Sequence, residues 1–461
     1  MRMFNNCYEL VTPPDLPATT VKSHGYCEMF AYCSSLLNPS IISALNLETY
    51  ACGEMFYNCT ALTGAPYLPA LTVTEQSYRA MFEGCNSLTN VPDLPATTVI
   101  TNGYVEMFKN CESLVDAPNI HAINVGEYAM SNMFQSCNSL INAPDNLPAT
   151  TLANGCYNRM FSDCTNLTKS PILPATILAQ SCYENMFEGC TSLVNAPKLP
   201  ATTLAQSCYY EMFVNCTSLH TTPELPATIL ADYCYEKMFS SCTNLVSAAN
   251  LNGTQAKASC CQNMFRDCIS LTNVPELPAT TLAQSCYESM FHNCTSLVNA
   301  NIILPATTLS ETCYNSMFYS CTQLKIPPII LAQTLAHASL HYMFYNCFSL
   351  IVAPELLATN LDNSCYKYMF KGCKSLTQAP ELPATTLAQS CYEGLFEDCE
   401  LLTQAPELPA TTLVNSCYNL MFNGCNNMTY IKVKFSDWKE DERTMGLYSY
   451  LDCICCFKWN I

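Results

Sequence analysis

A Met-Phe pair followed three residues later by cysteine recurs along almost the whole chain and sets its period. In the stretch SLTNVPELPATTLAQSCYESMFHNC, from Ser270 to Cys294, the pattern is Met290, Phe291 and Cys294. A repeat of fixed length is the sequence signature of a stacked array. The seventeen copies, in one of which Leu395 replaces the methionine, are spaced by 26 residues with two spacings of 27. Their phenylalanines fall at 4, 30, 56, 82, 108, 134, 161, 187, 213, 239, 265, 291, 318, 344, 370, 396 and 422.

Composition narrows the class of partner. The chain is 49% hydrophobic and 12% charged, which is typical of a folded protein rather than a disordered one. Its net charge of −18 argues against nucleic acid and anionic membrane surfaces, because both demand a basic footprint. No apolar run approaches the ~20 residues that cross a bilayer, so we expect no membrane insertion.

The N-terminus begins inside a repeat, two residues before Phe4, and shows no signal peptide. Terminal repeats normally carry a polar outer face. The sequence therefore predicts either a truncated coding sequence or a partner that covers the open N-terminal rung.

Each repeat predicts a short strand, a proline corner and a short helix. Leu271, Val274 and Leu277 would point inward from the strand, and Pro-Ala-Thr-Thr would form the corner. Ser285 and Glu288 match a Ser-x-x-Glu capping box, as do Ser181 with Glu184 and Ser390 with Glu393. Cys286 and Met290 are four residues apart, and so are Tyr287 and Phe291. This spacing puts the four apolar side chains on one face of a helix of about two turns.

The cysteine that follows the phenylalanine by three residues is preceded by glycine or asparagine in ten of the seventeen repeats. Both residues tolerate the left-handed conformation that ends a helix. Such a unit cannot bury its own apolar face, so it must stack on its neighbours. We expect about 17 rungs in a curved α/β solenoid over residues 1–428. The predicted core includes Phe187, Phe213, Phe239, Phe265, Phe291, Cys190, Cys216 and Cys294.

The 33 cysteines form columns rather than a disulfide framework. One column follows the phenylalanines from Cys7 to Cys425, and a second lies eight residues earlier in ten repeats. Eight helical residues span about 12 Å, beyond the roughly 7 Å between Cα atoms that a disulfide allows. The pattern favours buried, reduced thiols. Neither the cysteine spacing nor His337 and His341 fit a zinc motif, so no metal or cofactor is expected.

At Met-Phe-x-x-Cys-x-x-Leu, for example Phe187, Cys190 and Leu193, the chain resembles the BspA-type leucine-rich repeat proteins, whose units carry Ala-Phe-x-x-Cys-x-x-Leu after a proline-ended strand. The match covers about residues 3 to 430, with units longer than the family's usual 23 or so residues. The resemblance implies a leucine-rich-repeat fold and a secreted or cell-surface, adhesin-like protein, commonly from Bacteroidales.

Two columns could face a ligand. A tyrosine column, including Tyr183 and Tyr287, could anchor sugars or proteins, but its regular spacing favours packing between rungs. An acidic stripe precedes the second strand leucine and is either a solvated edge, a ligand-facing surface or, least favoured, a Ca²⁺ site. Its residues are Asp15, Asp93, Asp145, Glu224, Glu276, Glu355, Glu381 and Glu407.

The periodicity stops after Met428, and residues 429–461 are expected to form a C-terminal cap or tail. Extra residues near Asn146 and Ile303 are either binding loops or harmless drift. One environment repeated seventeen times does not resemble a catalytic site, so no enzyme is expected. The sequence therefore favours a scaffold that binds a protein or glycan at a cell surface. The alternative is a structural spacer or assembly component, possibly phage-associated, that docks through its ends.

Overall fold

The computed structural model describes residues 2–436, and they form two compact units. Unit 1 comprises residues 2–227 with 241–243, and unit 2 comprises residues 228–240 with 244–436. Each unit is a parallel β-solenoid in which one 26- or 27-residue repeat makes one rung. The repeat architecture predicted from the period is therefore confirmed within both units.

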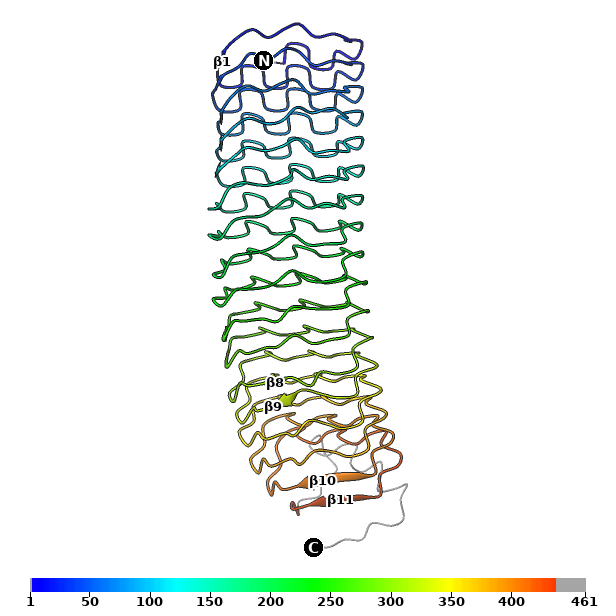
Figure 1. The fold of residues 1–461 in the computed structure, drawn as a ribbon. Helices are drawn as coiled ribbons and strands as arrows, with labels where there is room; N and C mark the ends of the chain where they lie inside the picture. Colours follow the sequence, from blue (N-terminus) through cyan, green and yellow to red (C-terminus); the bar gives the residue numbers. More distant parts are fainter. Residues whose placement is uncertain (1, 437–461) are drawn as a thin grey trace. The chain divides into compact units, whose positions relative to one another are not determined.

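The strands are short and pair in parallel between neighbouring rungs, with β8 beside β9 and β10 beside β11 (Figure 1). In unit 1, β1 pairs with β2, and β3, β4 and β5 form a three-stranded sheet. In unit 2, β6 pairs with β7, β8 with β9 and β10 with β11. The bounds are β1 (Thr20–Val21), β2 (Asn46–Leu47), β3 (Thr72–Val73), β4 (Thr98–Val99), β5 (Asn124–Val125), β6 (Gln255–Ala256), β7 (Thr281–Leu282), β8 (Ile303–Leu304), β9 (Ile329–Ile330), β10 (Gln404–Leu408) and β11 (Tyr430–Val433).

Most strands lie at the end of the Pro-Ala-Thr-Thr corner rather than before it. In the repeat from Ser270 to Cys294, which we call the reference repeat, the strand is Thr281–Leu282, although the sequence predicted it over residues 271–277. Leu271 and Leu277 do point inward, whereas Val274 is only half-buried and Pro275 takes the buried position. Proline cannot donate to a ladder, so the two prolines move the regular pairing to the threonines that follow. In β10 the strand occupies Gln404–Leu408, the segment where the repeat pattern predicts it.

The predicted short helix is wrong, because residues 2–436 contain no helix. The segment instead turns every four residues. Ser285, Ser289 and Asn293 have φ of 53°, 54° and 60°, which is left-handed backbone that an α-helix cannot contain. Ser289 and Asn293 are each the third residue of a turn closed by an i to i+3 hydrogen bond, such as Met290 N–H to Tyr287 O at 3.3 Å. A positive φ at that place is what a type II turn requires.

Alternate N–H groups in the same segment leave the rung and bond to the next one. Ser289 donates to the carbonyl of Asn315 at 2.8 Å and Phe291 donates to that of Met317 at 2.9 Å. The capping box also fails, because the Ser285 hydroxyl lies 2.7 Å from the Thr312 hydroxyl in the next rung. The backbone is thus satisfied half by turns and half by a parallel ladder between rungs.

The phenylalanine column fills the centre of each unit. Phe187 and Phe213 stack at 5.5 Å in unit 1, and Phe265 and Phe291 stack at 5.6 Å in unit 2. The predicted core residues are all fully buried: Phe187, Phe213, Phe239, Phe265, Phe291, Cys190, Cys216 and Cys294. Phe4, in the first described rung, is only half-buried.

The column cysteines have a defined hydrogen-bonding role. The Cys190 thiol donates to the carbonyl of Phe161 in the preceding rung at 3.1 Å, and Cys294 donates to Phe265 at 3.1 Å. Among the cysteines of residues 2–436 none forms a disulfide, and all except Cys7 are buried. Each phenylalanine carbonyl has a second lone pair that can accept a hydrogen bond from the next rung. Cysteine is small enough to fit between the rungs and carries one donor for that lone pair.

The first part of the segment expected to form a C-terminal cap or tail contains β11, which pairs with β10. The remainder of the predicted cap or tail, including Trp438, Trp459 and Cys453, lies outside the described residues.

Candidate functional site

The acidic stripe lies where the sequence placed it, at the solvent-facing edge before each corner. Seven of its residues are exposed, and Glu407 is half-buried. These residues supply at most one carboxylate per rung, which gives an interrupted row rather than a convergent cluster. Within residues 2–436 no group of three or more His, Cys, Asp or Glu side chains is arranged to hold a metal ion. Whether the stripe faces a ligand remains a prediction.

Parts of this stripe are already neutralised by neighbouring rungs. Lys169 Nζ lies 2.9 Å from Asp145 Oδ1, and Lys432 and Lys434 lie 2.6 and 3.1 Å from the two oxygens of Glu407. The hydrogen bonds from Lys432 and then Lys434 lower the pKa of Glu407. These pairs are exposed, so they contribute little to stability.

The tyrosine column belongs to the core, so its packing interpretation is confirmed. Tyr183 and Tyr209 stack at 5.8 Å, and Tyr287 and Tyr314 at 5.9 Å, all at most 2% exposed. Burial raises the pKa of the Tyr183, Tyr287 and Tyr314 phenols well above their usual value. These side chains cannot contact a ligand from solvent.

The turn segment presents a second surface, which we call the outer wall. In most rungs two buried residues alternate with two that are more exposed. In the repeat from Ser270 to Cys294, Glu288, His292 and Asn293 lie on the wall, whereas Ser289 is buried. The wall is held by the inter-rung ladder behind it. Its side chains therefore stand in columns while their identities change from rung to rung.

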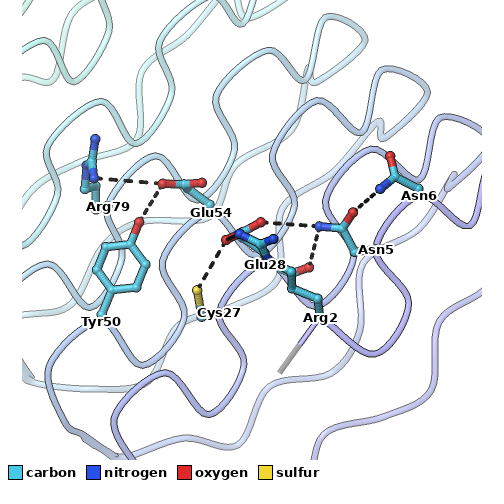
Figure 2. A network of polar contacts seen from close by, with 8 residues as sticks. All are labelled: Arg2, Asn5, Asn6, Cys27, Glu28, Tyr50, Glu54 and Arg79. Atoms are coloured by element: carbon cyan, nitrogen blue, oxygen red, sulfur yellow. Dashed lines mark hydrogen bonds and ion pairs between the residues drawn. The ribbon is translucent and has the colours of Figure 1, made fainter.

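At the start of unit 1 the outer wall carries a polar network (Figure 2). Arg2 lies 2.7 Å from Glu28, and Asn5 donates to the Glu28 carboxylate at 3.4 Å. Tyr50 donates to Glu54 at 2.5 Å, and Arg79 Nη1 lies 3.9 Å from the same oxygen. Every carboxylate here has a partner within the chain, so the network ties rungs together.

In unit 2 the outer wall instead carries a group of aromatic side chains, five of which we call the aromatic strip: His292, Tyr319, Tyr342, Tyr345 and Tyr368. His292 stacks on Tyr319 and Tyr319 on Tyr345, each at 4.6 Å and within 6° of parallel. Tyr342 stacks on Tyr368 at 5.5 Å and lies edge-on to Tyr345 at 80°. All five are half-buried, so each ring packs on one side and meets solvent on another.

The strip ends at charged residues that are paired with one another. Lys367 lies 3.0 Å from Glu393, and Lys371 lies 2.9 Å from Glu397. Both ammonium groups also sit over the ring of Tyr368, at 5.4 and 5.2 Å from its centroid. Such cation–π contacts fix long side chains against the aromatic surface.

A glycine makes room for the last ring. Tyr368 lies against Gly394, where a Cβ atom would overlap the ring carbons, and Gly394 has a φ of 58°. Replacement by any other residue would displace Tyr368 as well as strain the backbone.

Burial shifts the pKa values of two histidines and one tyrosine in the strip and beside it. It lowers the pKa of His292 to about 4, with Arg266 as the next cause, and lowers that of His341 to about 4, with Lys367 next. Burial and then Glu393 raise the pKa of Tyr368 to about 12. The imidazoles and the Tyr368 phenol are therefore neutral near pH 7.

The strip was not predicted from the sequence, because the candidate sites there were positions that carry the same residue type in many repeats. The signal was present as aromatic residues in successive copies of the position after the phenylalanine, at His292, Tyr319 and Tyr345.

The insertion near Asn146 leaves a visible change in the sheet. Pairing runs from β3 to β5 and resumes between Thr151 and Ile177. An open hollow of about 440 Å³ lies at this place, lined by Ile123, Asn124, Val125, Thr150 and Thr151. No convergent set of charged groups lines it.

Across residues 2–436 the structure has no helix that is long and apolar enough to cross a membrane. Searches of curated proteins and of solved structures found no match. The family model described as "Mycoplasma protein of unknown function, DUF285" matches residues 76–199. The model described as "BspA type Leucine rich repeat region (6 copies)" matches residues 154–274, 250–377 and 341–445, more than half of the chain. Together with the stacked rungs and the repeated Phe and Cys columns, this match shows that the chain belongs to the BspA-type leucine-rich repeat family.

Proposed function

We propose that the protein is a non-catalytic binding scaffold that recognises a protein or glycan at a cell surface. The outer wall supplies the contacts, and the repeated core holds that wall in place. The family supports the setting, since BspA-like repeats are often related to surfaces and adhesion. Extended solenoid surfaces are well suited to binding large partners.

The observation that carries this proposal is the contrast between a uniform core and a variable wall. The residue just inside the wall is always the column phenylalanine, whereas the residue after it varies along the array. Its half-buried copies include Tyr57, Glu83, Lys109, Gln135 and Glu188 in unit 1, and Arg266, His292, Tyr319, Tyr345 and Lys371 in unit 2. Structure alone would be served by one repeated polar residue, so this variation is expected of a recognition surface.

The acidic stripe is a second proposed contact surface, for a basic partner. Its row of exposed carboxylates adds to the net charge of −18. Contacts along such a row would be long-range and sensitive to ionic strength.

Binding of the full chain to immobilised glycoproteins of the extracellular matrix and serum tests the proposal, with a glycan array in parallel. We expect saturable binding to at least one protein or glycan, measured by biolayer interferometry. The control is the heat-unfolded chain, which should not bind in the same way. Absence of saturable binding to every member of both panels would contradict the proposal and favour a structural spacer.

A further inference from the structure

We infer that the aromatic strip of unit 2, with its uncharged neighbours on the outer wall, is a preformed site for a polypeptide segment of a partner protein. The inference rests on the proposed binding function and names the chemistry of one contact site.

The composition of the site is that of a protein-recognition surface. Over two successive rungs the outer wall carries Asn315, Ser316, Tyr319 and Ser320, followed by His341, Tyr342, Tyr345 and Asn346. Tyrosine supplies a large amphipathic area with few rotatable bonds, and serine and asparagine supply adaptable hydrogen bonds. These eight positions carry no acidic residue, lysine or arginine, although the chain as a whole is strongly acidic.

The rings are held before any partner arrives. Tyr319 is stacked between His292 and Tyr345, with both centroid separations at 4.6 Å. Tyr342 lies against His341 at 3.8 Å and edge-on to Tyr345 at 5.5 Å. Ordering of interface side chains normally opposes binding, so rings fixed in the free protein lose little entropy on contact.

Charged groups surround this uncharged centre and are already paired. Arg266 Nε lies 3.4 Å from Asp267 at one end, while Lys367 and Lys371 pair with Glu393 and Glu397 at the other. An uncharged aromatic centre with a charged rim is the usual anatomy of a protein interface. Because each rim charge has an internal partner, the rim imposes little net charge on the segment that binds.

The stacking geometry favours a polypeptide over a sugar. A sugar ring packs on the open face of an aromatic side chain, but neighbouring rings in the strip lie on one another. Tyr319 has a ring neighbour on each side, and Lys367 and Lys371 lie over the ring of Tyr368. The Tyr368 hydroxyl is also engaged, because it donates to Glu393 at 3.3 Å. A partner therefore meets the half-exposed parts of the rings, which suit the apolar side chains of a polypeptide.

The test compares the full chain with a Tyr319→Ser/Tyr345→Ser double variant on the same glycoprotein panel, before and after enzymatic removal of the glycans. A Tyr319→Phe/Tyr345→Phe variant keeps the stacked rings and removes only the hydroxyls. Tyr430→Ser is the matched control, because Tyr430 is 39% exposed and lies in β11, outside both the outer wall and the acidic stripe. Thermal unfolding of each variant checks that the fold persists.

We expect a protein bound by the wild type to bind equally well after deglycosylation. Its Kd should rise at least ten-fold in the double serine variant, by less in the phenylalanine variant, and not at all in Tyr430→Ser. Binding that disappears on deglycosylation, or that is confined to free glycans, overturns the polypeptide assignment. Unchanged binding by a folded double serine variant overturns the site while leaving the scaffold function standing. If the wild type binds nothing, the scaffold function fails, and this inference fails with it.

Discussion

At the scale of single residues, the structure gives each column of the repeat one physical task. Phenylalanine fills the centre, and cysteine donates its thiol proton to the phenylalanine carbonyl of the rung before. Methionine, as at Met290, packs beside the phenylalanine with no exposed surface. A residue in such a column contacts its counterparts above and below, so one substitution affects three rungs.

Replacing Phe291 with alanine should therefore destabilise unit 2 strongly. Phe291 is fully buried and stacks on Phe265 at 5.6 Å and on Phe318 at 5.4 Å. Large-to-small changes of this kind cost about 3–5 kcal/mol in the free energy of unfolding. Urea denaturation followed by circular dichroism measures the loss, with Phe291→Leu as the smaller change that should cost less. An unfolding curve that matches the wild type would show that the column is not the core.

Individual residues show which parts of the structure could be predicted from the sequence and which could not. The phenylalanine spacing predicted the inward column because a 26-residue period aligns equivalent residues whatever the backbone does between them. Val274 misled the strand prediction, since it is apolar yet half-buried while Pro275 is buried. His292, Tyr319 and Tyr345 were overlooked because recognition residues are those that depart from the repeat.

At the scale of elements, the turn segment explains the failed helix prediction. Cys286, Tyr287, Met290 and Phe291 point inward as two pairs four residues apart, and this pattern is close to the 3.6-residue period of a helix. Side-chain periodicity alone cannot separate the two. The backbone differs because left-handed residues recur every fourth position, and many are Ser, Glu or Tyr rather than Gly or Asn. The inter-rung hydrogen bonds compensate for that strain.

The left-handed positions should tolerate glycine and reject β-branched residues. Asn110 has a φ of 59°, and its N–H donates to the carbonyl of Gln135 at 2.9 Å. We expect Asn110→Gly to stay within about 0.5 kcal/mol of the wild type, and Asn110→Val to lose about 1–3 kcal/mol. Urea denaturation of the two variants side by side gives the difference. Equal stability of the valine and glycine variants would contradict the assigned turn.

At the scale of the whole chain, the cysteines matter through their number and their burial. Thiols in the two columns lie in apolar surroundings, and burial raises the pKa of Cys137, Cys182 and Cys321 from 9.0 to about 12. Desolvation disfavours the thiolate, so these groups hold their protons in the folded state where an unfolded chain would release them. The same columns that stabilise the rungs therefore make the fold sensitive to alkali.

The free energy of unfolding should fall as the pH rises above about 9. Between pH 9 and 12 the unfolded chain binds fewer protons than the folded chain, so each buried thiol lowers stability by about 1.4 kcal/mol per pH unit. Stability from a raised pKa is complete below the unfolded value and is lost as the pH approaches the folded one. Urea denaturation at successive pH values, with a phosphine reductant present to prevent disulfide formation, gives the slope.

Cys182→Ala separates this effect from the loss of lysine ion pairs over the same range. Cys182 is fully buried in unit 1, and its removal leaves a small cavity that lowers stability at every pH. The cavity does not change with pH, whereas the removed thiol does, so the slope between pH 9 and 11 should become shallower by about 1.4 kcal/mol per pH unit. An unchanged slope in this variant would mean that the thiol ionises as readily in the folded chain as in the unfolded one, which its burial does not allow.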